Sequence, residues 1–74
     1  MAAAQSAPGP DAQGAGPDTG LSLRRAQDHF VLGLDFYRTG AYREALREFE
    51  AALALAPSAD IWFNVGRAQQ QLGQ

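Results

Sequence analysis

Apolar residues recur at every third or fourth position from Leu21 onward, and this spacing predicts an amphipathic helix. Ser22 is the expected N-cap, with Thr19 as the competitor. The helix is expected to end at Gly40, because glycine takes the left-handed conformation that closes a helical turn. Its apolar stripe consists of Leu23, Ala26, Phe30, Leu34 and Tyr37, widened by Val31, Leu32 and Phe36.

A second helix is predicted from about Ala41 to Leu55, where the same period continues and charged residues occupy the opposite face. Pro57 ends it, since proline pushes the preceding residue towards extended geometry. Its apolar positions are Tyr42, Ala45, Leu46, Phe49, Ala52, Leu53 and Ala56.

A third helix is predicted after Ser58, a good N-cap, with Asp60 in a first turn where the helix dipole favours a carboxylate. It runs to Leu72, and Gly73 closes it. Three helices joined by very short links pack as consecutive antiparallel hairpins, so the expected fold is all-α.

Small residues indicate where the first two helices approach most closely. Gly33 lies inside the first helix, where glycine costs about 1 kcal/mol relative to alanine. Close contact with a large side chain such as Phe49 would offset that cost, and Ala45 and Ala52 would supply the facing hollows.

Two segments repeat each other thirty-three residues apart: Leu32-Gly33 recurs as Val65-Gly66, and Gly40 recurs as Gly73. A period in this range indicates one supersecondary unit stacked on its neighbour. Stacked units of this kind bind partners along an extended surface, and they rarely carry out chemistry.

The first twenty residues hold most of the proline and no apolar period, so residues 1–20 are interpreted as a disordered leader and residues 21–74 as the helical domain. The net charge of −2 is too small to indicate a nucleic-acid partner. No apolar run approaches the ~20 residues that span a bilayer. The leader has no secretory signal, so a cytoplasmic location is expected; a periplasmic or secreted one follows if a signal upstream of Met1 is missing.

These residues resemble the tetratricopeptide repeat. The resemblance covers Ala26 to Ser58 as one full repeat, and Ala59 to Gly73 as the first helix of a second. The matching pattern is His29-x-x-Leu32-Gly33-x-x-Phe36, then Ala45-x-x-x-Phe49-x-x-Ala52, then Pro57, with Trp62, Asn64, Val65 and Gly66 in the next unit.

The resemblance implies that first helices of successive repeats line a concave groove, which suits a peptide with an apolar anchor. The implied groove residues are Gln27, Phe30, Leu34 and Tyr37 from the first helix and Asp60, Phe63, Arg67 and Gln70 from the third. The alternative interpretation, in so small a chain, is that Phe30, Leu34 and Phe63 are simply core residues. Of the cluster with which some members grip a terminal carboxylate, only Asn64 is matched, and Asn64 is expected to brace the backbone between helices.

Catalytic chemistry has almost no support. His29 is the only histidine and occupies a packing position, and the chain has no cysteine. No metal set or catalytic arrangement is evident, so neither enzyme activity nor a cofactor is expected.

Two functions remain. The first is an interaction module that binds a peptide or protein in its groove. The second is a self-associating or truncated solenoid unit, with a homodimer left open, because Trp62 and Gly66 stand where the family packs its next helix. Trp62 therefore joins the groove residues as a candidate for partner binding.

Overall fold

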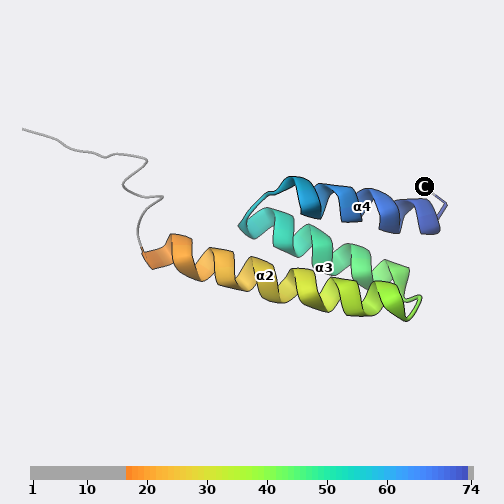
Figure 1. Ribbon diagram of the computed structural model, residues 1–74, viewed down its shortest axis with the longest axis horizontal. Coiled ribbons are helices and arrows are strands. Elements are labelled where there is room, and N and C mark those ends of the chain that lie inside the picture. The colour runs from red at the N-terminus through yellow and green to blue at the C-terminus, as the bar shows by residue number, and fades with distance from the viewer. Residues whose placement is uncertain (1–16, 74) are drawn as a thin grey trace, which may run out of the picture.

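The computed structural model describes residues 17–73, and this part of the chain is three helices with no strand. They are α2 (Pro17–Arg38), α3 (Tyr42–Leu55) and α4 (Ala59–Gln71). Figure 1 shows each helix running antiparallel to the one before it, with α3 between α2 and α4. The predicted all-α fold, an antiparallel helical hairpin plus a third helix, is confirmed.

The start of α2 differs from the prediction. The helix begins at Pro17, four residues before Leu21, so neither Ser22 nor Thr19 is its N-cap. Proline is favoured at the first position of a helix because its missing N–H would have no partner there. Residues 17–20, assigned to the leader, are thus helical. The rest of the predicted leader, residues 1–16, lies outside the described residues.

The other helix ends follow the sequence signals. Gly40 has φ +84°, and it closes α2 in a Schellman turn: Ala41 N–H donates to the carbonyl oxygen of Phe36 at 2.9 Å, and Gly40 N–H donates to that of Tyr37 at 3.1 Å. At the start of α4, the hydroxyl oxygen of Ser58 accepts a hydrogen bond from the N–H of Ile61 at 3.2 Å. Gly73, with φ +80°, follows the last turn of α4.

The core forms around α3, and its centre is Phe49, which is fully buried. The Phe49 ring lies against Gly33 of α2, and the Phe30 ring packs on it with centroids 5.7 Å apart. The predicted contact between Gly33 and Phe49 is confirmed. The rest of the buried apolar set consists of Ala26 on α2, Ala45 and Ala52 on α3, and Ile61, Val65 and Ala68 on α4.

One polar contact joins α2 to α3 at the side of this core. His29 Nδ1 lies 2.7 Å from Glu48 Oε1. His29 therefore occupies a position between the first two helices, as predicted, and its ring is held by a carboxylate there.

Candidate functional site

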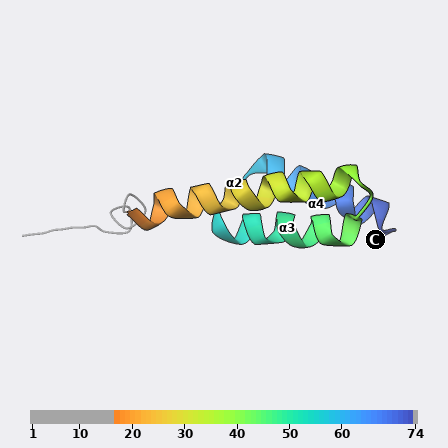
Figure 2. The ribbon, with the colours of Figure 1, turned by 90° about the horizontal axis from the view of Figure 1, so that it is seen from below.

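The face shared by α2 and α4 brings together residues that lie about thirty positions apart in the sequence. Figure 2 shows α2 and the start of α4 on the same side of α3. Phe30 and Tyr37 on α2 are seven residues apart, as are Asp60 and Arg67 on α4. Seven residues are almost two helical turns, so each pair lies on one side of its helix. The α2–α4 face therefore has two levels, one at Phe30 and Asp60 and one at Tyr37 and Arg67.

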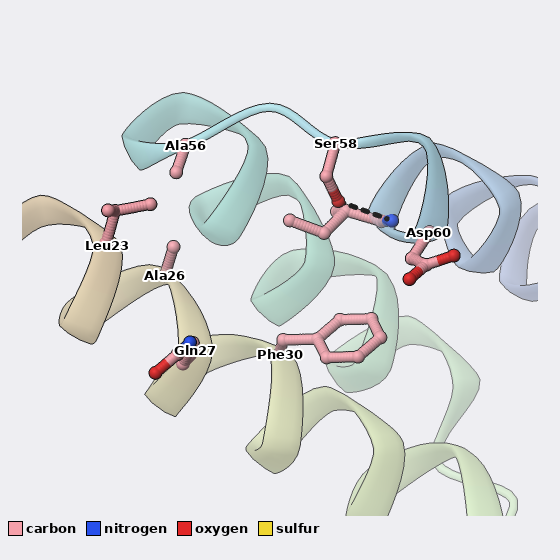
Figure 3. Close-up of a pocket in the computed structure, with 8 residues that line it drawn as sticks. Leu23, Ala26, Gln27, Phe30, Ala56, Ser58 and Asp60 are labelled. Carbon is pink, nitrogen blue, oxygen red and sulfur yellow. Dashed lines mark hydrogen bonds between the residues drawn. The ribbon is translucent and has the colours of Figure 1, made fainter.

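The first level contains a hollow of about 270 Å³ between α2, the α3–α4 link and α4. Asp60 lies at the α4 rim of the hollow, and the other polar residues that line it are Gln27 of α2 and Ser58 (Figure 3). Five apolar residues make up most of the lining: Leu23, Ala26, Phe30, Ala56 and Ile61. The hollow can accept an apolar group while offering a carboxylate at its edge.

The second level is built around the guanidinium of Arg67. Its Cζ lies 4.6 Å from the centroid of the Tyr37 ring and 5.7 Å from that of Phe63. Both distances are within the range of a cation–π interaction. Arg67 Nη1 also donates to Asn64 Oδ1 at 3.3 Å. These contacts hold the guanidinium in place across α2 and α4.

Arg67 has no carboxylate partner in the described part of the chain. The ion pairs found there are His29 with Glu48 and Asp35 with Arg38. A guanidinium has five N–H donors, and one of them is used by Asn64. The others are available to an anionic group of a binding partner.

The sequence predicted that Asn64 would brace the backbone between helices, and this prediction is wrong. Its side chain is 7% exposed, and Nδ2 donates to the carbonyl oxygen of Asp60 at 2.8 Å within α4 itself. Its Oδ1 accepts from Arg67. The amide therefore satisfies a carbonyl of its own helix and positions the arginine one turn further on.

The candidate partner-binding residues separate into groups. Tyr37, Phe63 and Arg67 lie in contact, while Gln27 and Phe30 line the hollow. Phe30 and Leu34 are half-buried against the core, so each serves packing as well as the surface. Trp62 and Gln70 are exposed on α4, outside both groups.

The two candidate aromatics of α4 differ from the half-buried ones of α2. Trp62 is 61% exposed and Phe63 is 66% exposed. They are neighbours in sequence, so about 100° of helical rotation separates them. Phe63 contacts Arg67 on the α2–α4 face. Trp62 is four residues before Gly66 and so lies on the same side of α4 as this glycine, where an added Cβ would meet no atom within 4 Å.

Sequence reasoning missed the contribution of Leu23 and Ala56 to the hollow. Leu23 lies where α2 extends past the end of α3, and Ala56 begins the link between α3 and α4. Leu23 belongs to the predicted apolar stripe, but the sequence contains no signal for the path of the link. The hollow could therefore not be anticipated.

Neither metal chemistry nor a membrane span is indicated by residues 17–73. No group of three or more His, Cys, Asp and Glu side chains there is arranged to hold a metal ion. No helix in the same range is long and apolar enough to cross a bilayer.

Residues 26–59 match the family model of the tetratricopeptide repeat. This segment is a tetratricopeptide repeat. The match begins in α2 and ends at the first residue of α4, so the repeat comprises the hairpin of α2 and α3. With α4 following as a third helix, the structure fits a fragment of a tetratricopeptide solenoid. No curated protein and no solved structure matches the chain.

The repeat suggests a coarse class of function. Tetratricopeptide repeats are protein–protein interaction modules and are in general non-catalytic, which agrees with the behaviour of stacked repeat units.

Proposed function

We propose that the protein binds a peptide segment of a protein partner on the α2–α4 face. The observation that carries this proposal is Phe63, a large aromatic side chain that is 66% exposed beside a guanidinium fixed by two rings. Exposed aromatics and arginines are the side chains that most often dominate binding energy at interfaces. The hollow at the other level offers an apolar pocket for a second anchor.

The proposal is tested by selecting peptides from a random display library against the whole chain and measuring their affinities for two alanine variants. Phe63→Ala removes the exposed ring of the α2–α4 face, and Trp62→Ala removes a neighbouring ring of similar exposure that faces elsewhere. We expect Phe63→Ala to weaken binding at least tenfold and Trp62→Ala to leave it within about twofold, since truncation of a central anchor costs roughly 2 kcal/mol or more. Equal losses, or a loss at Trp62 alone, would contradict the proposal.

A second function, self-association, is favoured by the surface around Trp62. This ring is 61% exposed, and Gly66 one turn later lies open. A large exposed aromatic beside a flat glycine is a surface on which another helix can pack closely. We infer that this edge of α4, rather than the α2–α4 face, would make the contact between copies.

A further inference from the structure

We propose that the segment bound on the α2–α4 face is bipolar: it places a basic side chain at Asp60 and an acidic side chain at Arg67. This inference rests on the proposed function and adds the chemistry of the partner. The two charged groups lie on one side of α4, at the two levels of the face, and neither has an ion-pair partner among residues 17–73.

The Arg67 level suits a carboxylate. The exposed guanidinium lies over the rings of Tyr37 and Phe63, which restrict its position. Within residues 17–73 its hydrogen bond goes to Asn64, through one Nη1 donor, which leaves the other donors for a ligand. An arginine whose position is restricted by ring contacts and a hydrogen bond loses less side-chain freedom on pairing with a carboxylate than a freely moving surface arginine does.

The Asp60 level suits a lysine or arginine. The hollow beside Asp60 is lined mainly by apolar side chains, among them Phe30 and Ile61. Long basic side chains have an apolar stem and a charged head, so the stem can fill such a hollow while the head meets the carboxylate. The amide of Gln27 on the opposite wall adds a neutral hydrogen-bonding group and no competing charge.

The spacing of the two groups sets the spacing of charges in the partner. Asp60 and Arg67 are seven residues apart on one helix, which is about 10.5 Å along its axis at 1.5 Å per residue. An extended peptide in polyproline II geometry rises about 3.1 Å per residue and has three residues per turn, so two opposite charges on one side of it at about this distance would be three residues apart. In a helical peptide they would be seven residues apart.

Synthetic peptides of defined charge test this inference directly. Each peptide carries leucine and phenylalanine between its two variable positions, and these positions are filled by Lys with Glu, Lys with Lys, Glu with Glu, or Gln with Gln. One series spaces the variable positions by three residues and a helix-forming series spaces them by seven. In one series, we expect the mixed-charge peptide to bind at least about threefold tighter than the Gln peptide. Both like-charged peptides of that series should bind no tighter than the Gln peptide.

Variants of the protein assign each charge. Asp60→Asn should remove the preference for the Lys–Glu peptide over the Glu–Glu peptide, and Arg67→Gln should remove the preference for the Lys–Glu peptide over the Lys–Lys peptide. Each preference is a ratio of two affinities for the same variant, so a general loss of binding cancels. Glu50→Gln and Arg43→Gln, exposed on α3, are the charge-matched controls and should change neither preference. Circular dichroism verifies that each variant folds.

The outcomes separate the two proposals. If mixed-charge and Gln peptides bind equally, the bipolar inference is wrong and peptide binding on this face stands. If no peptide of either series binds, both proposals are overturned. A preference that persists in Asp60→Asn or in Arg67→Gln would show that the charge it was assigned to is not the one being recognised.

Discussion

At the residue scale, the contact between Gly33 and Phe49 decides how closely α2 and α3 can pack. A Cβ built on Gly33 would lie 2.6 Å from Phe49 Cε1 and 2.7 Å from Cδ1, well inside van der Waals contact. Phe49 is fully buried, so its ring has no free space into which it can move. The absence of a side chain at Gly33 is therefore what allows the Phe49 ring to pack directly on the backbone of α2.

Substitutions at Gly33 should destabilise the fold although glycine is a poor helix former. We expect Gly33→Leu to lower the free energy of unfolding by roughly 1–3 kcal/mol or to abolish cooperative unfolding, because overpacking forces the two helices apart. Gly33→Ala should also lower it, since the clash outweighs the helical gain. Thermal and urea unfolding followed by circular dichroism measure both.

Gly66 supplies the matched control. It occupies the equivalent position of α4, where no atom lies within 4 Å of an added Cβ. Gly66→Ala should therefore stabilise the protein by up to about 1 kcal/mol through helix propensity alone. If alanine changes the free energy of unfolding in the same way at both glycines, the packing role assigned to Gly33 is wrong.

The residue scale also shows where prediction from sequence fails. The Gly33–Phe49 contact could be predicted, because an interior glycine is costly and the helical spacing left few large side chains to face it. The contacts of Asn64 and Arg67 could not, because long polar side chains choose among several partners only when neighbouring helices are in place. Arg67 meets Tyr37 of α2, thirty residues away in sequence, and this pairing depends on the angle between helices.

At the element scale, the helix ends that carry a capping residue could be predicted from the sequence. The start of α2, which has no apolar period, was predicted at the wrong residue. Ser58, Gly40 and Gly73 act through their own side chain or backbone, so their roles are visible in the sequence. The first turn of α2 has no apolar residue to extend the stripe, and the prediction began at Leu21. Pro17 at the first helical position was the signal that could have located the true start.

The cap at Ser58 should contribute measurably to the stability of α4. Ser58→Ala removes the acceptor for the Ile61 N–H, and Ile61 is one of the buried residues that join α4 to the core. We expect a loss of about 1 kcal/mol in the free energy of unfolding. Ser58→Asp, which restores a capping oxygen, should recover most of it. An alanine variant as stable as the parent would mean that the hydroxyl contributes nothing at this helix end.

Removal of residues 1–16 should leave the three helices unchanged. The segment has no apolar period in its sequence, and α2 begins at Pro17. We expect the shortened chain to keep the same helical signal in circular dichroism and the same melting midpoint within about 2 °C.

A chain lacking residues 1–22 is the informative comparison, because it also removes the part of α2 beside Leu55 and Pro57 and should melt at a lower temperature. Loss of cooperative melting in the chain that lacks only residues 1–16 would show that these residues pack on the helices.

At the scale of the whole molecule, apolar side chains remain uncovered on both outer helices. On α2, Val31 is 56% exposed and Leu32 is 43% exposed, while α4 presents Trp62 and Phe63. Only α3 is covered on two sides within residues 17–73, because α2 and α4 both pack against it. Each repeat of a solenoid gains stability from its neighbours, so the two open sides of this unit have apolar surface that a neighbouring unit or a partner can bury.

Trp62 reports whether this surface is used between copies. We expect its fluorescence, the only tryptophan signal in the chain, to shift to shorter wavelength as concentration rises from nanomolar to high micromolar, together with a rise from monomer to dimer mass. Burial of the ring away from water is the physical cause. Gly66→Glu places a charge in the contact while keeping the fluorophore, and it should hold the protein as a monomer with unshifted emission; Trp62→Ala should likewise abolish the dimer mass. Phe63→Ala, on the other face of α4, should dimerise as the parent does. Emission independent of concentration from a species of monomer mass would rule out self-association and leave Trp62 as a surface residue of a self-contained three-helix module.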